Sequence, residues 1–430
     1  MKFTERPKYL EAYMIHGRDK TPQWDYTHHL IPPITSSVTF RLESVERGAA
    51  GFSQYAKLDE LPDEPIYIYE RLEDPTTGML EDRLAAMEGG ECAVTFATGM
   101  AAISGCILSL LKNGDHLISH KSIYGCTYSL FHNWLPRQGI KVDFVDMRHS
   151  DWENSINNNT RVVYFETPIN PTLELIDIKK VKEIVDRHNK RLGDDEKIRI
   201  VVDNTFASPY CQRPIELGAD IVVGSITKHI GGFNTAMGGY VVAPASHYNK
   251  ILLVRKDFGG ALHARTAWHH LVYGIPTLAA RMRQEMKTAE TLARYLLTKK
   301  EVREVHYPGL ESYPYYDLAK RQMRDHSGEF APGALVYFVI KGEPKEAQRD
   351  AARLMNWLAK NATSYTLAVS LGCIKTLIEH PSSMTHSAIP PHEQLDAGIE
   401  PGGVRISVGL EEPSILIEEM DAAFRNVFGS

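Results

Sequence analysis

The sequence predicts an α/β protein in which a mostly parallel central sheet is followed by a smaller α+β domain. Two observations support this fold class. From about residue 75, short apolar runs rich in β-branched residues alternate with amphipathic stretches, and Gly, Asp, Asn or Pro bound most runs. After about residue 279, longer amphipathic helices with scattered strands take over. Regular alternation of strands and helices places helices on both faces of a sheet.

Seven short apolar runs supply the strands expected in the central sheet. They cover residues 93–97, 116–119, 142–146, 162–166, 198–203, 221–227 and 240–243. Helical patterns fall between them at 81–89, 100–114, 127–139 and 178–193. Later strands are expected near 302–307, 334–340, 367–371 and 404–408. The closing helix carries a stripe typical of core packing, formed by Ile417, Met420, Phe424 and Val427.

The chain divides into three predicted parts. Residues 1–72 show little sustained periodicity and are expected to form an arm over another surface, because they could not bury a core alone. Residues 73–278 would hold the central sheet, and residues 279–430 would form the C-terminal domain. A length of 430 residues suits two domains with such an arm.

The composition is that of an ordinary soluble globular protein. Apolar residues make up 43% and charged residues 24%, and the net charge of -6 offers no basic face to nucleic acid or anionic lipid. The longest apolar stretches are too short to cross a bilayer, and the N-terminus lacks the apolar core of a signal peptide. The five scattered cysteines predict free thiols in a reducing compartment. We therefore expect a cytoplasmic protein with no membrane or nucleic-acid partner.

Two neighbouring predicted strands end in residues that suit covalent catalysis. One ends in Asp203, and the next runs into Lys228 with Ser225 and Thr227 just before it. A lysine at a strand end is usually a solvated charge, and Asp203 alone could be a turn acid or a helix cap. Together they offer a nucleophilic amine, hydroxyl donors for a phosphate and a carboxylate that keeps a pyridine nitrogen protonated.

Further candidates lie at the same predicted edge of the sheet. The first predicted strand leads into Gly99 and Met100 at the start of a helix, where free amides can bind an anion. Many strand–helix turns share this pattern, so it indicates a phosphate site only in combination with Lys228 and its neighbours. Tyr124 follows the second strand, where its ring could stack on a cofactor and its hydroxyl could move protons, although loop tyrosines are commonly packing residues.

The chain resembles a known family, the pyridoxal 5′-phosphate (PLP) dependent enzymes of cysteine and methionine metabolism, or trans-sulfuration group. The resemblance runs from about residue 32 to about residue 411. Its segments, in order, are PPITSSVTF, YERLEDPT, GMAAI, YGCTY, ETPINPT, VVDNTFASP, SITKHIGG, SMTHS and EPGGVRISVGLE. It implies PLP as cofactor and the aspartate-aminotransferase-like fold, called fold type I.

The resemblance also implies roles for individual residues. Lys228 would bind PLP covalently, Asp203 would pair with the ring nitrogen, and Tyr124 would stack on the ring and take part in catalysis. Further cofactor contacts are implied for Gly99, Met100, Thr205, Ser225 and Thr227. The substrate would be held by Asn170, Ser370 and Arg405, with Arg405 clamping the carboxylate.

Two residues of the arm are implied to act in a neighbouring subunit. Tyr69 and Arg71 would reach the partner's cofactor phosphate, which implies a dimer with shared active sites, commonly paired into a homotetramer. Without the resemblance, this stretch would be predicted as a surface loop, and Arg405 as part of a surface salt bridge.

Within the family, three features favour a methionine γ-lyase-like member. Cys126, a candidate catalytic residue, stands where relatives acting on cystathionine usually carry glycine, although it could be a small buried filler. Val369 stands where they typically carry glutamate. Lys256 and Asp257 resemble a Lys–Asp pair near the lyase site. The expected reaction is α,γ-elimination on methionine or a related sulfur amino acid, giving 2-oxobutanoate, ammonia and a thiol.

Several alternatives remain. An O-acetylhomoserine sulfhydrylase-like γ-replacement would use the same residues, and cystathionine γ-lyase or γ-synthase activity ranks next. A catalytically inactive protein with the PLP fold is a remote alternative, and a nicotinamide dehydrogenase would need a glycine fingerprint that is missing.

Two segments depart from the family pattern and leave the substrate open. They are 263–282, and 51–72, which is longer than is usual before the Tyr-x-Arg pair. His263, His269 and His270 of the first segment have no acid or cysteine at ligand spacing, so no metal is expected.

Overall fold

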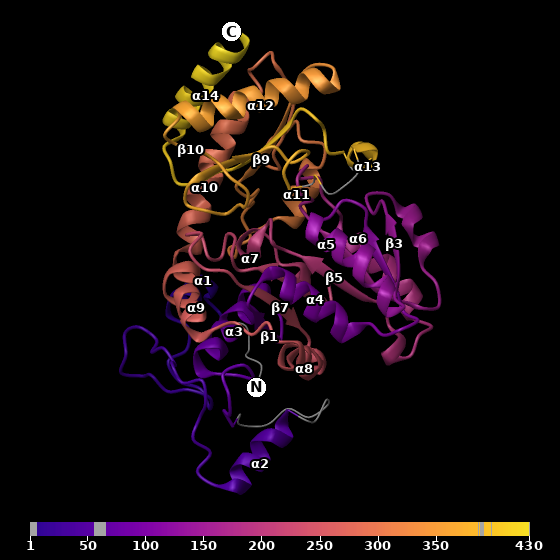
Figure 1. Ribbon diagram of the computed structural model, residues 1–430, viewed down its shortest axis with the longest axis vertical. Helices are drawn as coiled ribbons and strands as arrows, with labels where there is room; N and C mark the ends of the chain where they lie inside the picture. Colours follow the sequence, from indigo (N-terminus) through magenta and orange to yellow (C-terminus); the bar gives the residue numbers. More distant parts are fainter. Residues whose placement is uncertain (1–6, 56–65, 386, 388–390, 397, 430) are drawn as a thin grey trace.

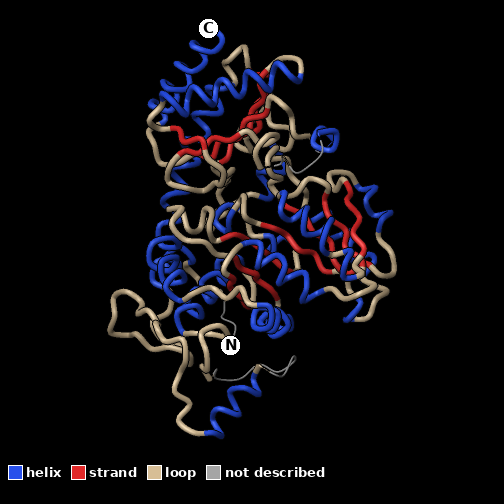
Figure 2. Tube along the Cα trace, in the orientation of Figure 1, coloured by secondary structure: helices blue, strands red, loops and turns tan. Residues whose placement is uncertain are grey.

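Two separate sheets organise the protein. The computed structural model describes residues 7–55, 66–385, 387, 391–396 and 398–429. The seven-stranded sheet has the order β1–β7–β6–β5–β4–β2–β3, and the five-stranded sheet has the order β10–β11–β12–β9–β8. Figure 1 shows the smaller sheet above the larger one, and Figure 2 shows their strands as two separate groups. The predicted fold class is confirmed.

The central sheet is mostly parallel. Its strands are β1 (Cys92–Phe96), β2 (His116–His120), β3 (Lys141–Val145), β4 (Thr160–Glu166), β5 (Arg199–Asp203), β6 (Ile221–Ser225) and β7 (Gly239–Ala243). β7 lies antiparallel between β6 and β1, and the other neighbours pair in parallel. Because β7 opposes both of its neighbours, β1 points the same way as β6. The carboxyl ends of β1 to β6 therefore share one edge.

Helices bury both faces of this sheet. In β4, Val162 and Tyr164 pack in a cluster with residues of α4, whereas Val163 and Phe165 pack in a cluster with residues of α6. This alternation follows from the two-residue period of a strand. The helices that precede or flank the sheet are α1 (Leu10–His16), α2 (Val45–Gln54), α3 (Pro75–Glu88), α4 (Gly99–Leu110), α5 (Gly125–Ser129), α6 (Ile178–Asn189), α7 (Ser208–Cys211), α8 (Tyr248–Phe258) and α9 (Ala264–His269).

The smaller sheet is mainly antiparallel and packs against long helices. Its strands are β8 (Val302–His306), β9 (Leu335–Ile340), β10 (Tyr365–Leu367), β11 (Thr376–Glu379) and β12 (Gly403–Ser407). The remaining helices are α10 (Ile275–Leu296), α11 (Tyr316–Gln322), α12 (Pro344–Asn361), α13 (Pro391–Asp396) and α14 (Pro413–Phe428). Met420 and Phe424 of α14 are buried, as their spacing predicted.

Two predicted strands need correction. The strand expected at 367–371 is wrong, because β10 ends at Leu367 and Ser370 has a φ of 92°, which no strand contains. The strand expected at 221–227 ends at Ser225, since Gly231 and Gly232 donate their N–H groups back to the carbonyls of Ile226 and Lys228. Lys228 therefore lies in a tight turn after the strand.

The predicted three-part division remains a prediction. The arm contains the short helices α1 and α2, and part of its longer segment, residues 56–65, lies outside the described residues. The boundary expected between residues 278 and 279 falls inside α10, which packs against α1 near the large sheet and against β8 and β9 of the small sheet. A single helix thus joins the two regions.

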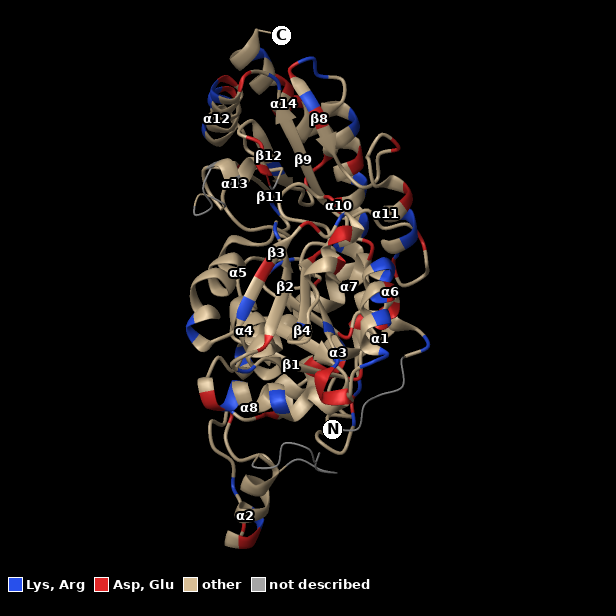
Figure 3. Cartoon of the chain, turned by 90° about the vertical axis from the view of Figure 1, so that its right-hand side faces the viewer, with Lys and Arg blue, Asp and Glu red and all other residues tan. Residues whose placement is uncertain are grey.

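Basic and acidic side chains both occur on the outer helices. Figure 3 shows Lys or Arg together with Asp or Glu along α8 and along α12. Some pair within one helix, such as Lys182 with Asp186 in α6 and Arg353 with Asp350 in α12. No helix in the described ranges is long and apolar enough to cross a membrane.

Candidate active site

The carboxyl edge of the central sheet brings the ends of β1 and β6 together. Phe96 of β1 and Ser225 of β6 both pair with Gly239 of β7, so the two ends lie at one level. Helix α4 begins at Gly99, just after β1. A Cβ added to Gly99 would lie 3.0 Å from the Cβ of Ser225, so glycine permits this close approach.

The start of α4 suits an anion. The first amides of a helix, here those of Gly99 and Met100, have no acceptor within the helix. The Ser225 hydroxyl lies beside Gly99, and the hydroxyls of Ser225 and Thr227 both donate to the carbonyl of Gly238, at 3.5 and 3.2 Å. Free amides next to hydroxyl donors fit a phosphate group.

Asp203 is buried at the end of β5 and is held by two donors. Its Oδ1 accepts the N–H of Thr205 at 2.9 Å, and its Oδ2 accepts the hydroxyl of Tyr164 at 3.3 Å. The Oγ1 of Thr205 accepts the N–H of Ser225 at 2.9 Å, which ties the acid to the anion site. Burial raises the pKa of Asp203. Hydrogen bonds from Thr205, through its hydroxyl as well as its N–H, and from the Tyr164 hydroxyl oppose that shift. A buried carboxylate of this kind fits a cationic ring nitrogen.

Lys228 meets residues of the small sheet. Its amine donates to Oγ of Ser370 at 2.7 Å. Burial and the nearby Arg405 charge lower the pKa of Lys228 to about 8, while the charge of Glu379 opposes this shift. An amine with this pKa is partly uncharged near neutral pH and can act as a nucleophile or a base.

Arg405 completes this cluster from β12. Its Nη1 donates to Oδ1 of Asn170 at 2.8 Å, and its Nη2 donates to the carbonyl of Ser370 at 2.8 Å. Nη2 also lies 3.0 Å from Oε1 of Glu379, which faces Arg405 across β11 and β12. Burial lowers the pKa of Arg405, and Glu379 counteracts that effect. The predicted substrate residues and Lys228 are therefore one connected group.

Tyr124 precedes α5, and its side chain is half-exposed. Its N–H donates to Oε1 of Glu166 at 2.7 Å. Burial of the hydroxyl and the adjacent Cys126 thiol raise the pKa of Tyr124 above its usual value. Cys126 is exposed, so the alternative of a small buried filler is wrong.

Tyr69 and Arg71 lie outside this cluster. Within the described part of the chain, Nη1 of Arg71 donates to the carbonyl of Lys256 at 2.5 Å, and its guanidinium lies 5.5 Å from the centre of the Tyr69 ring. Lys256 in turn pairs with Asp257 at 2.6 Å. These four residues form a surface group, which we call the arm group.

Two buried acids near the site were not predicted from the sequence. Glu166 ends β4 next to Asp203, and the pattern of an acid ending each of two successive strands could have revealed it. Glu379 could not be placed because β11 was not predicted. Both acids lie among the predicted site residues.

The divergent segment 263–282 has local structural roles. His263 caps α9 by accepting the N–H of Arg265, and His269 bonds to Oγ1 of Thr235 at 2.8 Å. Burial lowers the pKa of His270 to about 4. Over the residues whose placement is known, no group of three His, Cys, Asp or Glu side chains is arranged for a metal ion.

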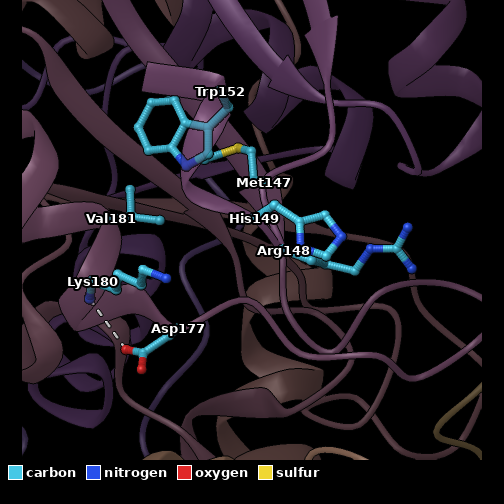
Figure 4. Close-up of a pocket in the computed structure, with 7 residues that line it drawn as sticks. All are labelled: Met147, Arg148, His149, Trp152, Asp177, Lys180 and Val181. Carbon is cyan, nitrogen blue, oxygen red and sulfur yellow. Dashed lines mark hydrogen bonds between the residues drawn. The ribbon is translucent and has the colours of Figure 1, made fainter. Parts of the chain in front are cut away.

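A separate small hollow lies between the end of β3 and the start of α6 (Figure 4). Its lining is Met147, Arg148, His149, Trp152, Asp177, Lys180 and Val181. Arg148 is already paired with Asp146 and Glu174. None of the predicted site residues lines this hollow, so it is distinct from the candidate site.

Fold and site together define a PLP-dependent enzyme of fold type I, because the amine, the buried acid and the anion site meet at one sheet edge. Comparison with known proteins extends this result. The chain belongs to the Cys/Met metabolism PLP-dependent enzyme family, whose model matches residues 11–425. Its cofactor is therefore PLP.

Individual relatives resemble the chain over nearly its full length. L-methionine gamma-lyase of Fusobacterium nucleatum subsp. nucleatum is 38% identical over 400 residues, which cover 93% of this chain and 94% of the relative. L-methionine gamma-lyase of Porphyromonas gingivalis is 39% identical, covering 91% of each chain. The crystal structure of cystathionine gamma-lyase from Lactobacillus plantarum, complexed with L-serine, superposes with a TM-score of 0.83 at 31% identity, covering 97% and 99% of the two chains.

The pKa of Lys228 predicts how cofactor uptake depends on pH. In cofactor-free protein, the uncharged amine is the nucleophile, so the rate of covalent PLP binding should rise with pH and level off above about 8. The visible absorption band that develops after PLP addition measures this rate. Lys228→Ala should not develop the band.

The variant Glu379→Gln supplies the matched test. Since the Glu379 charge raises the pKa of Lys228, its removal should shift the midpoint of the pH profile to lower pH. A midpoint near 10.5, the ordinary value for lysine, in the unmodified protein would contradict the assignment.

Proposed function

We propose that the protein catalyses PLP-dependent α,γ-elimination on L-methionine, releasing 2-oxobutanoate, ammonia and methanethiol. The observation that carries the proposal is the contact of Lys228 with Ser370 next to the buried Arg405. It sets a nucleophilic amine beside a guanidinium that suits an amino-acid carboxylate. The choice of methionine is supported by the similarity to enzymes named L-methionine gamma-lyase.

PLP, when bound, withdraws electrons from the α-carbon of an amino acid. The residues of the chain would do the remaining work. Asp203 keeps the ring nitrogen protonated, and the amides at the start of α4 bind the phosphate. The Lys228 amine holds the cofactor and would then take the α-proton. A second proton must leave the β-carbon before the bond between the γ-carbon and sulfur can break, and water then converts the remaining unsaturated amine to 2-oxobutanoate and ammonia. Arg405 and Asn170 orient the substrate carboxylate, and the Tyr124 hydroxyl gives a proton to the departing thiolate.

An apolar side chain near Ser370 supports an uncharged substrate tail. Val369 precedes Ser370 and is 54% exposed. The isopropyl group of Val369 carries no charge that could pair with the distal amino group of cystathionine. The thioether tail of methionine is uncharged and needs no such partner. Cys126 is exposed and lies beside Tyr124, the residue proposed to protonate the leaving sulfur.

Methionine alone tests the proposed reaction. The PLP-loaded protein should release 2-oxobutanoate and methanethiol from L-methionine, and Lys228→Ala should lose this activity by a factor of about 10³ or more. A keto-acid assay and a thiol assay measure the two products. If methionine stays intact while O-acetylhomoserine and sulfide give a thiol amino acid, the protein is a γ-replacement enzyme instead.

Val369→Glu tests the recognition of the substrate tail. A carboxylate at this position should favour the distal amino group of cystathionine, raising kcat/KM for cystathionine relative to methionine by about tenfold, which corresponds to about 1.4 kcal/mol. Val369→Gln is the uncharged control of similar size. If the ratio of the two kcat/KM values changed equally in Val369→Glu and Val369→Gln, the preference would not depend on charge.

We further propose a cytoplasmic homotetramer, a dimer of dimers whose subunits share active sites. The five cysteines are free, which suits a reducing compartment. The exposed arm group, with Tyr69 and Arg71, is apart from the Lys228 cluster of its own chain, which suits a role in the partner's site. The arm also exposes apolar side chains, among them Leu30 at 97% and Val45 at 84%.

Hybrid proteins test the sharing of sites. Arg71→Ala and Lys228→Ala should each be inactive, but mixed oligomers should regain about a quarter of the wild-type activity, because half of the dimers are hybrids and each hybrid has one intact site. That quarter refers to the unsorted mixture; hybrid dimers isolated by coexpression with two different tags should show about half of the wild-type activity. Light scattering gives the oligomeric mass. No recovery in isolated hybrids would place Arg71 in its own subunit's site.

A further inference from the structure

Glu166 is a buried acid for which the proposed reaction has no use. It ends β4, directly opposite Asp203 at the end of β5, and the two strands run parallel. Residues in register on neighbouring strands point to the same face, so the two carboxyl groups lie side by side. Glu166 is 5% exposed and Asp203 is 8% exposed. The sheet therefore holds two acids together out of water.

The main chain of Tyr124 is attached to Glu166. Oε1 of Glu166 accepts the Tyr124 N–H at 2.7 Å, and the two residues are 42 positions apart in the sequence. Tyr124 directly precedes the short helix α5, which has no side-chain cap. The hydrogen bond thus fixes the loop after β2 to the strand next to Asp203. A change in the Glu166 side chain should move Tyr124 relative to the acid that faces the cofactor ring.

Two adjacent buried carboxyl groups cannot both be ionised without a large penalty. The titratable groups that face Glu166 are Asp203 from β5, Tyr164 from β4 and Tyr124 from the loop after β2. None of these three is a cation. Burial and the Asp203 charge raise the pKa of Glu166 far above its usual value.

The hydrogen bonds distinguish the two acids. Asp203 accepts from the N–H of Thr205 and from the hydroxyl of Tyr164, and such donors stabilise a carboxylate. Glu166 accepts the N–H of Tyr124 through one oxygen, which a neutral carboxyl group does equally well through its carbonyl oxygen. The proton therefore belongs on Glu166, and the negative charge belongs on Asp203.

We propose that Glu166 is a positioning residue whose uncharged carboxyl group fixes the main chain of Tyr124 and leaves the negative charge of the pair to Asp203. The family's cofactor fits this arrangement, since a cationic ring nitrogen needs one carboxylate rather than two. The inference concerns PLP binding alone and does not depend on the identity of the substrate.

Two substitutions of similar size separate the parts of this proposal. Glu166→Gln keeps an oxygen acceptor and is neutral, so the variant should bind PLP within about threefold of the wild-type dissociation constant, which is under 1 kcal/mol. Glu166→Met is also neutral but has no strong acceptor. The unpaired Tyr124 N–H should weaken PLP binding by about tenfold. Titration of the cofactor-free proteins with PLP measures both constants.

The visible circular dichroism band of bound PLP gives a readout that simple loss of stability would not move. Under saturating PLP, the band and its pH dependence should match the wild type in Glu166→Gln and should weaken in Glu166→Met, because the Tyr124 ring is displaced. Asp203→Asn is the positive control: it removes the carboxylate that pairs with the ring nitrogen, so it must change both the band and its pH dependence. If Glu166→Gln weakens PLP binding and the band as much as Glu166→Met does, a neutral acceptor at position 166 is not sufficient. If both variants match the wild type, Glu166 does not position Tyr124. Either result overturns the proposal.

Discussion

The contact between the loop at 370–374 and the turn at 228–232 fixes the geometry of the site. Lys228 follows the central sheet and Arg405 belongs to the small sheet, so their separation depends on how these two segments meet. They meet closely: a Cβ added to Gly372 would lie 2.3 Å from the main-chain nitrogen of His229, and Gly372 has a φ of 70°. The N–H of Ile374 also donates to the carbonyl of Gly232 at 2.8 Å. Neither segment can shift without moving the other.

Ser370 connects the two charged groups across this contact. Its φ of 92° lies in a region that disfavours side chains and typically costs about 1–3 kcal/mol. The conformation persists because both ends of the residue are held: the hydroxyl accepts from Lys228, and the carbonyl accepts from Arg405. The strained backbone therefore turns the hydroxyl and the carbonyl of one residue toward an amine and a guanidinium that come from different sheets.

The sequence predicted the seven strands of the central sheet because each is a buried run of β-branched residues between turn residues. It failed around 367–379, where Leu367 to Leu371 has strand-like composition. There the pairing of β10 with β11 ends at Leu367, and the chain turns away at Ser370, whose φ is positive. The pattern of the strand ends predicted that Asp203 and Lys228 would be neighbours. It could not predict Glu379, which depends on the pairing of β11 with β12. Only the family resemblance singled out Tyr69 and Arg71, because by composition and spacing alone their stretch is predicted to be a surface loop.

The pairing of Glu379 with Arg405 explains how the protein can bury this guanidinium, which we propose binds the substrate carboxylate. An isolated buried cation would be strongly unfavourable, and Glu379 supplies the counter-charge from the facing strand. In the proposed reaction, the substrate carboxylate would meet an Arg405 whose charge Glu379 already balances, so it would replace or share hydrogen bonds instead of pairing with an isolated charge. The favourable free energy of binding the carboxylate would therefore be smaller. The protein would then bind the unreacted substrate less tightly but still hold it in a fixed orientation beside Lys228. That orientation is what lowers the activation barrier for removal of the α-proton.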